Sequence, residues 1–399
     1  MKVLIGALGR GRPQKDGTVG YEGTTYGFED GTTVDADFFI YALTQHVKPD
    51  HLIVIATEAV KEGALPELKE WIDLEAVPIT VVDIPNGKDR NEAWAIFNAV
   101  VAKYDELFPE GSDQPEVYMD ITNGLRSIPV LMLSIARYLQ RSRRINLRGI
   151  FYGAYDAVEQ TRKVKPVYQV DSFITVLDWA SAIDTFLMTG NSVQLAEVLE
   201  TQNLAIQNAA EIADALRTLS EALDLVRIEE VHQYSQSAVD AVKKVDVVGL
   251  TAENRIIAEL LRRLQFELEP LAMSQPQSNL TLFLKKNLKL VLWYFKRNRY
   301  QDAMLVAREW MLTYKMQHQS ATHKRTKYSP AEMFMREHRE AEEGFHQWKI
   351  KDKKELHREI NDVRNSLAHG GFSDDQTAQD IITRINSVIA NLQKLEVVL

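Results

Sequence analysis

The sequence of 399 residues contains no cysteine. Disulfide bonds, thiolate metal sites and cysteine nucleophiles are therefore excluded. The sequence also lacks any run of 18 apolar residues, and its beginning, MKVLIGAL, has neither the basic start nor the cleavage site of a signal peptide. We therefore expect a protein without membrane contact, and a cytoplasmic location.

Several motifs of nucleotide and metal chemistry are missing as well. Gly9 and Gly11 begin no dinucleotide fingerprint because Gln14 stands where the third glycine belongs, and no GxxxxGK[ST] phosphate loop occurs. The nine histidines show no HExxH or paired ligand spacing. We therefore expect no metal and no cofactor, and the sequence argues against a metal-dependent nuclease.

Charge is distributed unevenly along the chain. The net charge is −9, but residues 281–360 hold 18 Lys and Arg against 10 Asp and Glu, a net charge of +8, which leaves −17 for the remainder. Such asymmetry indicates a local basic surface on an acidic protein. A solvated helical face would give the same count, so charge alone does not establish nucleic-acid binding.

The first 170 residues alternate short Val- and Ile-rich runs with helical segments. This pattern predicts a doubly wound α/β domain with a mostly parallel sheet. The expected strands are residues 2–8, 51–57, 78–85, 116–122 and 146–152, and the expected helices are residues 35–46, 66–74, 91–107 and 127–140. The glycine-rich residues 9–33 are too long for a simple connection, and they predict a functional loop or a small hairpin.

The remainder of the chain has the periodicity of helices. Residues 173–188 and 193–265 are amphipathic, the proline-containing residues 269–279 predict a joint, and further helices are expected at 280–296, 300–317, 330–342, 351–369 and 374–395. The sequence thus predicts an α/β domain at 1–172, a helical connector at 173–275 and an all-α domain at 276–399.

Two loops of the α/β half contain groups that suit a phosphorylated ligand. Gly9 and Arg10 follow the first strand, and Thr122, Asn123, Gly124 and Arg126 follow the fourth, directly before a helix. Ligands of open parallel sheets bind beyond the carboxyl ends of the strands, and helix N-termini and guanidinium groups bind phosphate. Asn-Gly is also a common turn, so the loop by itself does not prove a binding site.

The C-terminal half contains the segment RNSLAH, in which Arg364 and His369 are separated by four residues. Arg227 and His232 have the same spacing in an acidic helix, and a looser pair, Arg339 and His346, is interrupted by glycine. Arg364–His369 is favoured because it closes the most basic helix and precedes two glycines, a helix stop. A histidine at a helix C-terminus also occurs without a catalytic role.

Arginine and histidine are sufficient for cleaving RNA at its own 2′-hydroxyl without metal. Histidine moves protons near neutral pH, and arginine holds the charge of the phosphorane. The pair lies about 140° apart around the helix axis, so two copies across a two-fold axis would complete a groove. Asn365, four residues before His369, could orient the imidazole or the substrate.

Together, RNSLAH, the segment LGRG after the first strand and DITNGLRSIP after the fourth resemble the CARF–HEPN ancillary ribonucleases of CRISPR type III systems. The resemblance implies a Rossmann-like CARF sensor followed by an all-α HEPN domain, in a homodimer or higher even oligomer. It implies activation by cyclic oligoadenylate, with tetra-adenylate favoured over hexa-adenylate, and cleavage of single-stranded RNA to a cyclic phosphate product. Arg364, Asn365 and His369 match the catalytic residues. Gly9, Arg10, Thr122, Asn123, Gly124 and Arg126 match ligand-binding positions.

Two other functions are compatible with the sequence. In the first, a sensor regulates a helical domain that binds nucleic acid without cutting it, and His369 is structural. In the second, the α/β half is a small-molecule enzyme that depends on Thr122, Asn123 or Arg126, and the helices only dimerise it.

Overall fold

The computed structural model describes residues 1–13, 19–73, 76–109, 111–124, 127–143, 145–155, 163–201, 206, 208–245, 252–276, 279–319, 339–341, 351–370 and 376–396. The chain divides into two compact units, Met1–Thr175 and Val176–Leu399, and each is described by itself.

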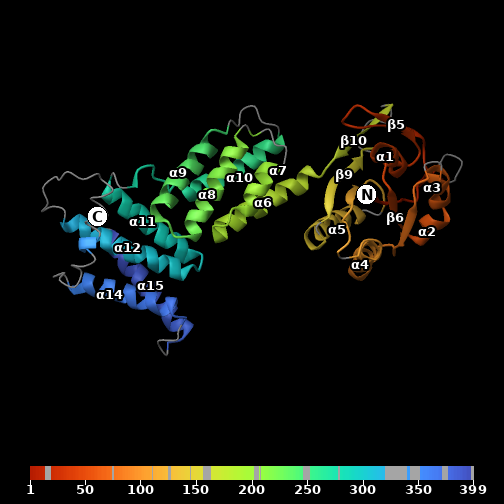
Figure 1. The fold of residues 1–399 in the computed structure, drawn as a ribbon. Coiled ribbons are helices and arrows are strands. Elements are labelled where there is room, and N and C mark those ends of the chain that lie inside the picture. The colour runs from red at the N-terminus through yellow and green to blue at the C-terminus, as the bar shows by residue number, and fades with distance from the viewer. Residues whose placement is uncertain are drawn as a thin grey trace. The chain divides into compact units, whose positions relative to one another are not determined.

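The first unit is built on an eight-stranded sheet with the order β5-β4-β10-β9-β8-β1-β6-β7 (Figure 1). Neighbouring strands are parallel except for two antiparallel pairs, β9–β10 and β4–β5. The strands are β1 (Lys2–Ala7), β4 (Thr24–Gly27), β5 (Thr33–Ala36), β6 (His51–Ala56), β7 (Ile79–Asp83), β8 (Glu116–Asp120), β9 (Asn146–Gly153) and β10 (Val164–Gln169). A separate hairpin pairs β2 (Arg12–Pro13) with β3 (Val19–Gly20).

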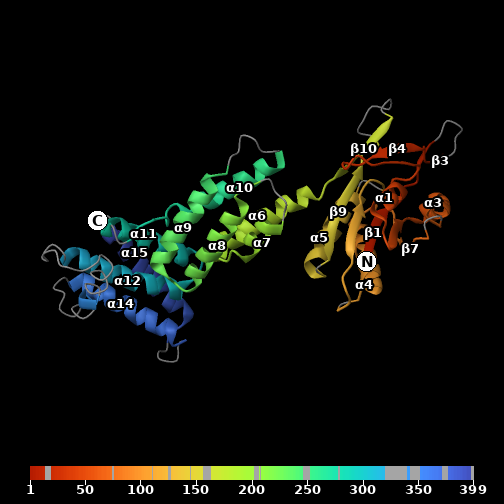
Figure 2. The same cartoon turned by 45° about the horizontal axis from the view of Figure 1, so that its top comes forward.

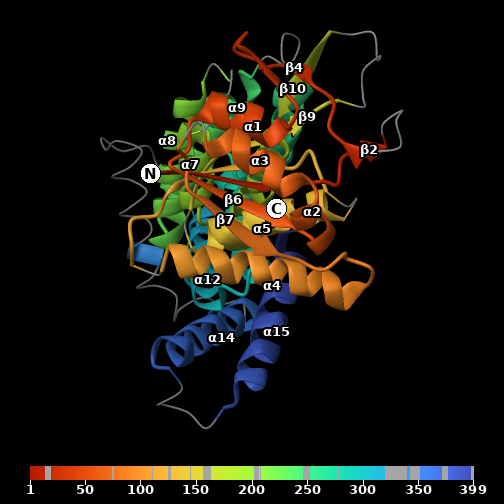
Figure 3. The same ribbon diagram turned by 90° about the vertical axis from the view of Figure 1, so that its right-hand side faces the viewer.

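Helices cover both faces of this sheet. Helices α1 (Phe39–Val47), α2 (Glu58–Glu62) and α3 (Ala64–Asp73) lie on one side, and α4 (Arg90–Leu107) and α5 (Ile128–Ser142) on the other (Figure 3). Strand β1 explains the arrangement: Val3 and Ile5 belong to the core beneath α4 and α5, whereas Leu4 belongs to the core beneath α1 and α3. Apolar residues at every position therefore bury both faces, as the run KVLIGA predicts.

The structure confirms the predicted Rossmann-like fold, and all five expected strands are present. Three strands of the large sheet were not predicted: β4, β5 and β10 have the short or polar sequences TTYG, TVDA and VKPVYQ. The expected helix at 35–46 begins only at Phe39, because Asp35 and Ala36 belong to β5. Residues 9–33 contain the hairpin that was one of the two alternatives, together with β4.

The second unit is entirely helical in its described residues. Its helices are α6 (Ser172–Thr189, which begins in the first unit), α7 (Val193–Thr201), α8 (Ala209–Asp224), α9 (Ile228–Lys243), α10 (Ala252–Leu268), α11 (Leu280–Lys296), α12 (Tyr300–Gln319), α14 (Lys351–Ala368) and α15 (Ala378–Glu396). Helices α11, α12, α14 and α15 pack against one another near the C-terminal end (Figure 2). The expected helix at 330–342 lies outside the described residues except at 339–341.

One continuous core runs through this unit from Trp179 to Leu392 and crosses the expected joint at residues 269–279. His232 of α9 connects the two sides of this joint. One of its ring nitrogens lies 2.7 Å from the carbonyl oxygen of Leu271, and the other lies 2.6 Å from Oδ1 of Asn287 in α11. Residues on both sides of the predicted domain boundary at 275/276 belong to this one core. The boundary stays a prediction.

Among the described residues, no helix is both long and apolar enough to cross a membrane.

Candidate functional site

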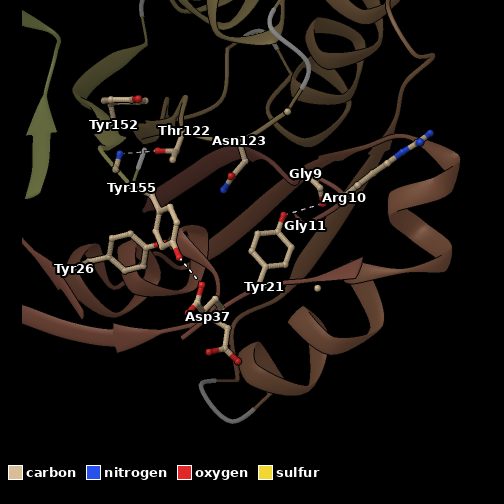
Figure 4. Close-up of a pocket in the computed structure, with 14 residues that line it drawn as sticks. Gly9, Arg10, Gly11, Tyr21, Tyr26, Asp37, Thr122, Asn123, Tyr152 and Tyr155 are labelled. Atoms are coloured by element: carbon tan, nitrogen blue, oxygen red, sulfur yellow. Dashed lines mark hydrogen bonds between the residues drawn. The ribbon is translucent and has the colours of Figure 1, made fainter. Parts of the chain in front are cut away.

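A cavity of about 350 Å³ lies beyond the carboxyl ends of β1, β8 and β9 (Figure 4). Parallel pairing of β1 with β8 and of β8 with β9 brings these three strand ends to one edge of the sheet. The described residues that line the cavity are mostly glycines and residues with polar side chains: Gly9, Arg10, Gly11, Gly20, Tyr21, Glu22, Tyr26, Asp37, Thr122, Asn123, Gly124, Tyr152, Gly153 and Tyr155. This is the ligand position that open parallel sheets favour.

The loop after β8 is fixed by two hydrogen bonds at its base. Asp120 Oδ1 accepts from the backbone N–H of Thr122 at 2.7 Å, and Thr122 Oγ1 accepts from the N–H of Gly153 at 2.8 Å. The hydroxyl therefore connects the ends of β8 and β9. Because both bonds are made within the protein, the loop backbone is preorganised before a ligand arrives.

Asp120 is completely buried beneath this loop. Its Oδ2 has no hydrogen-bond partner in the described part of the chain, and its side chain lies so close to Gly6 that a Cβ there would approach Asp120 Cβ to 2.9 Å. Burial raises the pKa of Asp120 from 3.8 to about 7, although the hydrogen bonds with Thr122 act in the opposite direction. The loop that lines the cavity with Thr122 and Asn123 thus rests on a buried carboxyl group whose pKa is raised to about 7.

Tyr21 closes the cavity on the side of the hairpin. Its hydroxyl donates to the carbonyl oxygen of Gly9 at 2.8 Å, and burial raises the pKa of this phenol well above its usual range. Gly11 adopts a φ of +82°, and a Cβ there would lie 2.6 Å from the carbonyl oxygen of Gly20. Only glycine allows the hairpin backbone to approach this closely.

The structure brings five of the six predicted ligand-binding residues together: Gly9, Arg10, Thr122, Asn123 and Gly124 all line the cavity. Arg126 lies outside the described residues. Arg10 is exposed, and its guanidinium extends away from the tyrosines at the other end of the cavity (Figure 4). A second, more apolar cavity of about 210 Å³ shares Gly9, Arg10 and Gly124 with the first.

Sequence reasoning missed an aromatic and acidic end of the cavity. Tyr26, Tyr152 and Tyr155 line it together with Glu22 and Asp37, and these residues come from β4, β9 and the segments beside them. Tyr155 donates a hydrogen bond to Glu22 at 3.1 Å (Figure 4). The glycine-rich character of residues 9–33 was the signal that could have pointed to them, because that segment provides two of the five, Glu22 and Tyr26.

The predicted catalytic residues lie at the C-terminal end of α14. Arg364 is half-buried, its Nη2 donates to Asn365 Oδ1 at 2.8 Å, and its Nε is buried without a hydrogen-bond partner in the described residues. His369 is exposed just beyond the helix, and its backbone N–H donates to the carbonyl of Asn365 at 3.0 Å. Gly370 follows with a φ of +60°, a left-handed helix stop.

The competing Arg227–His232 pair is structural. His232 is 0% exposed, both of its ring nitrogens are bonded, and burial lowers its pKa. Arg227 instead pairs with Glu230 at the surface. His346 lies outside the described residues, so the second competing pair remains untested.

Helix α14 also presents polar side chains next to Arg364. Asn361 contacts the ring of His357 at 3.2 Å, and the spacings of three and four residues place both on the helix face of Arg364. The adjacent face, with Leu356, Ile360 and Val363, is buried in the helical core. The polar face of α14 therefore continues from Arg364 toward the start of the helix.

Comparison with known families identifies the first unit. Residues 3–156 match the family model described as the CARF domain of the CRISPR system endoribonuclease Csx1. The first unit is a CRISPR-associated CARF domain. Residues 175–269 match the second domain of the CRISPR-associated protein MJ1674. The CARF domain is thus followed by a helical region, of which α6 to α10 carry this second match.

Two individual proteins show how far the likeness extends. CRISPR-associated protein MJ1674 of Methanocaldococcus jannaschii is 24% identical over 281 residues, which cover 58% of this chain. The match spans 43% of that relative, less than half of its length. The structure of Enterococcus italicus Csm6 bound to cyclic hexa-2′-fluoro-hexa-dAMP aligns with a TM-score of 0.49 at 12% identity, covering 100% of this chain and 94% of that one.

Proposed function

We propose that this protein is a cyclic-oligoadenylate-activated, metal-independent endoribonuclease that cuts single-stranded RNA in CRISPR type III defence. One observation carries the proposal: in a chain whose first unit is a CARF domain, Arg364, Asn365 and His369 lie together at the accessible end of a helix. The proposal assigns ligand binding to the first unit and RNA cleavage to the second.

The cavity supports the assignment of ligand binding. It offers backbone N–H groups, the Asn123 amide and the Arg10 guanidinium at one end, and tyrosines at the other. Anionic phosphates suit the first set, and bases suit the second. Cyclic tetra-adenylate is the proposed activator, and cyclic hexa-adenylate is the alternative that the test includes.

In the proposed reaction, the 2′-hydroxyl of RNA attacks the adjacent phosphorus and the bond to O5′ breaks. The proton of the 2′-hydroxyl leaves to a base, O5′ acquires a proton, and the products are a 2′,3′-cyclic phosphate and a 5′-hydroxyl. His369 transfers protons in this scheme, and Arg364 stabilises the phosphorane. Asn365, bonded to Arg364, orients the guanidinium.

The geometry of α14 supports a homodimer as part of this proposal. Five residues of helix separate Arg364 and His369 by about 140° around the axis, so one helix would hold a single phosphate poorly. Two copies related by a two-fold axis would face two such pairs across one groove. Ligand binding that favours this arrangement would activate the protein by shifting its population.

The test is cleavage of a fluorescent single-stranded RNA in EDTA, with and without cyclic tetra- and hexa-adenylate. Wild type is expected to cleave only with one ring, and His369→Ala is expected to bind that ring but not to cleave. Arg262→Ala is the control, because Arg262 is an exposed residue of α10 that pairs with Glu259. Ring binding without cleavage by wild type would instead support a sensor that regulates a non-catalytic domain.

A further inference from the structure

We infer that the carboxylates of Asp37 and Glu22 recognise the exocyclic amine of an adenine base, so the tyrosine end of the cavity selects the base of the activator. The inference rests on the proposed function, and it names residues that distinguish one base from another.

The two carboxylates face the cavity in different ways. Glu22 is exposed, and Tyr155 Oη holds its Oε2 at 3.1 Å. Asp37 is half-buried between β5 and α1, and within the described part of the chain its carboxylate makes no hydrogen bond or ion pair. When a ligand covers such an acceptor, the carboxylate loses its water. This costs free energy unless the ligand donates a hydrogen bond to it.

Charge decides which part of the ligand this end can accept. Among the described residues lining the cavity, the charged side chains are Glu22, Asp37 and Arg10. Glu22 is bonded to Tyr155. Arg10 extends away from Tyr155 and Asp37 (Figure 4). Phosphate oxygens near the carboxylates would be repelled. A group that suits this end of the cavity therefore carries no negative charge and donates hydrogen bonds.

An adenine base meets both requirements. Its 6-amino group donates two hydrogen bonds and its ring is flat and uncharged, so a carboxylate can accept from the amine while an aromatic side chain contacts the ring. Tyr26 is buried and fixed by edge-to-face contact with Phe39 at 5.1 Å between centroids. The second cavity has no carboxylate in its described lining, so recognition of an amine by a carboxylate belongs to the first of these two cavities.

The experiment measures equilibrium binding of two ligands to the full-length protein. One is cyclic tetra- or hexa-adenylate, whichever binds, and the other is a ring of the same size in which purine replaces adenine and no amine remains. Wild type is expected to bind the adenylate ring about tenfold more tightly. Asp37→Ala and Glu22→Ala are each expected to reduce this ratio, and the double variant is expected to bring it close to one.

The control is Asp35→Ala, which removes a carboxylate of β5 that accepts from Thr25 and does not line the cavity. This variant is expected to keep the wild-type ratio. A variant that merely distorts the cavity would weaken both rings alike, so the ratio separates recognition from folding. Asp37→Leu, which is close to aspartate in shape but has no acceptor, gives the same readout if Asp37→Ala is unstable.

Equal binding of both rings by wild type, or a ratio that Asp37→Ala and Glu22→Ala leave unchanged, would overturn the inference alone. Failure of wild type to bind either adenylate ring would overturn the proposed function as well. A cyclic guanylate that binds more tightly than the adenylate would assign the carboxylates to a guanine edge and would overturn the adenine assignment.

Discussion

The sensor cavity and the end of α14 contrast in how their functional groups are held. In the cavity, Asp120, Thr122 and Gly153 form a chain of hydrogen bonds that fixes the loop from below. At the end of α14, Arg364 bonds only to its neighbour Asn365 among the contacts described, and His369 lies in solvent. One site is preorganised, whereas the side chains of the other make few contacts with the described residues.

This difference fits the two proposed tasks. A site that must bind a small ligand tightly gains affinity when its loops are ordered beforehand. A site that must stay inactive until a signal arrives is better left incomplete, because a full constellation in each copy would cut RNA continuously. The variants below would break or sharpen this comparison, from the largest expected effect to the smallest.

Replacing Arg364 with lysine is expected to reduce RNA cleavage about 1,000-fold, or by about 4 kcal/mol of transition-state stabilisation, because lysine cannot bind phosphate in a bidentate way. Activator binding should not change. The matched control is Arg358→Lys on the same helix, where the guanidinium is 84% exposed and lies 3.8 Å from Asp362. An equal loss of RNA cleavage in both variants would show that replacing either arginine of α14 with lysine impairs cleavage, and would contradict a specific role for Arg364.

Asp120→Asn is expected to alter how stability depends on pH. Since burial raises the pKa of Asp120 from 3.8 to about 7, wild type loses stability as pH rises through that interval and the penalty is complete above 7. The stability of the variant relative to wild type should therefore increase by about 4 kcal/mol between pH 4 and pH 8, measured by urea unfolding. A pH-independent difference would contradict a buried, titrating carboxyl group.

His232→Ala is expected to destabilise the helical unit by about 2 kcal/mol, because it opens a cavity and leaves Asn287 and the Leu271 carbonyl without their partner. The lowered pKa of His232 has a further consequence. Wild type should lose stability as pH falls below the usual histidine range, and the variant should lose less. Thermal unfolding of both proteins across pH 5–8 measures the two effects, and an unchanged melting temperature at pH 8 would contradict the packing role.

Thr122→Val is expected to weaken activator binding about tenfold, because valine has the shape of threonine but cannot accept from the Gly153 N–H. Thr122→Ser, which keeps the hydroxyl, should bind nearly as wild type does. Calorimetric titration with the adenylate ring tests both variants. Equal affinity in valine and serine variants would show that the bond between β8 and β9 does not organise the cavity.

The sequence by itself determined the parallel core of the first unit and the region of each candidate site. Strands such as KVLIGA and HLIVIA are apolar on both faces, and this pattern has one stable solution, a sheet covered by helices on both sides. Because parallel strands end at one edge, the loops containing Gly9 and Thr122 could be placed together before the structure was known. The helical second unit followed from the 3.6-residue period.

Tertiary structure alone decided the parts that depend on contacts distant in sequence. Strand β10 lies between β4 and β9 and pairs with both, and its sequence VKPVYQ carries no clear alternation. In the sequence, Asp120 is a polar residue at the end of a strand. Packing against Gly6 buries its carboxyl group completely. Tyr26, Asp37 and Tyr155 meet around one cavity only because β4 and β5 fold back beside β9 and β10. Local pattern encodes which face of an element is buried, whereas long-range packing sets which side chains share a cavity and how they ionise.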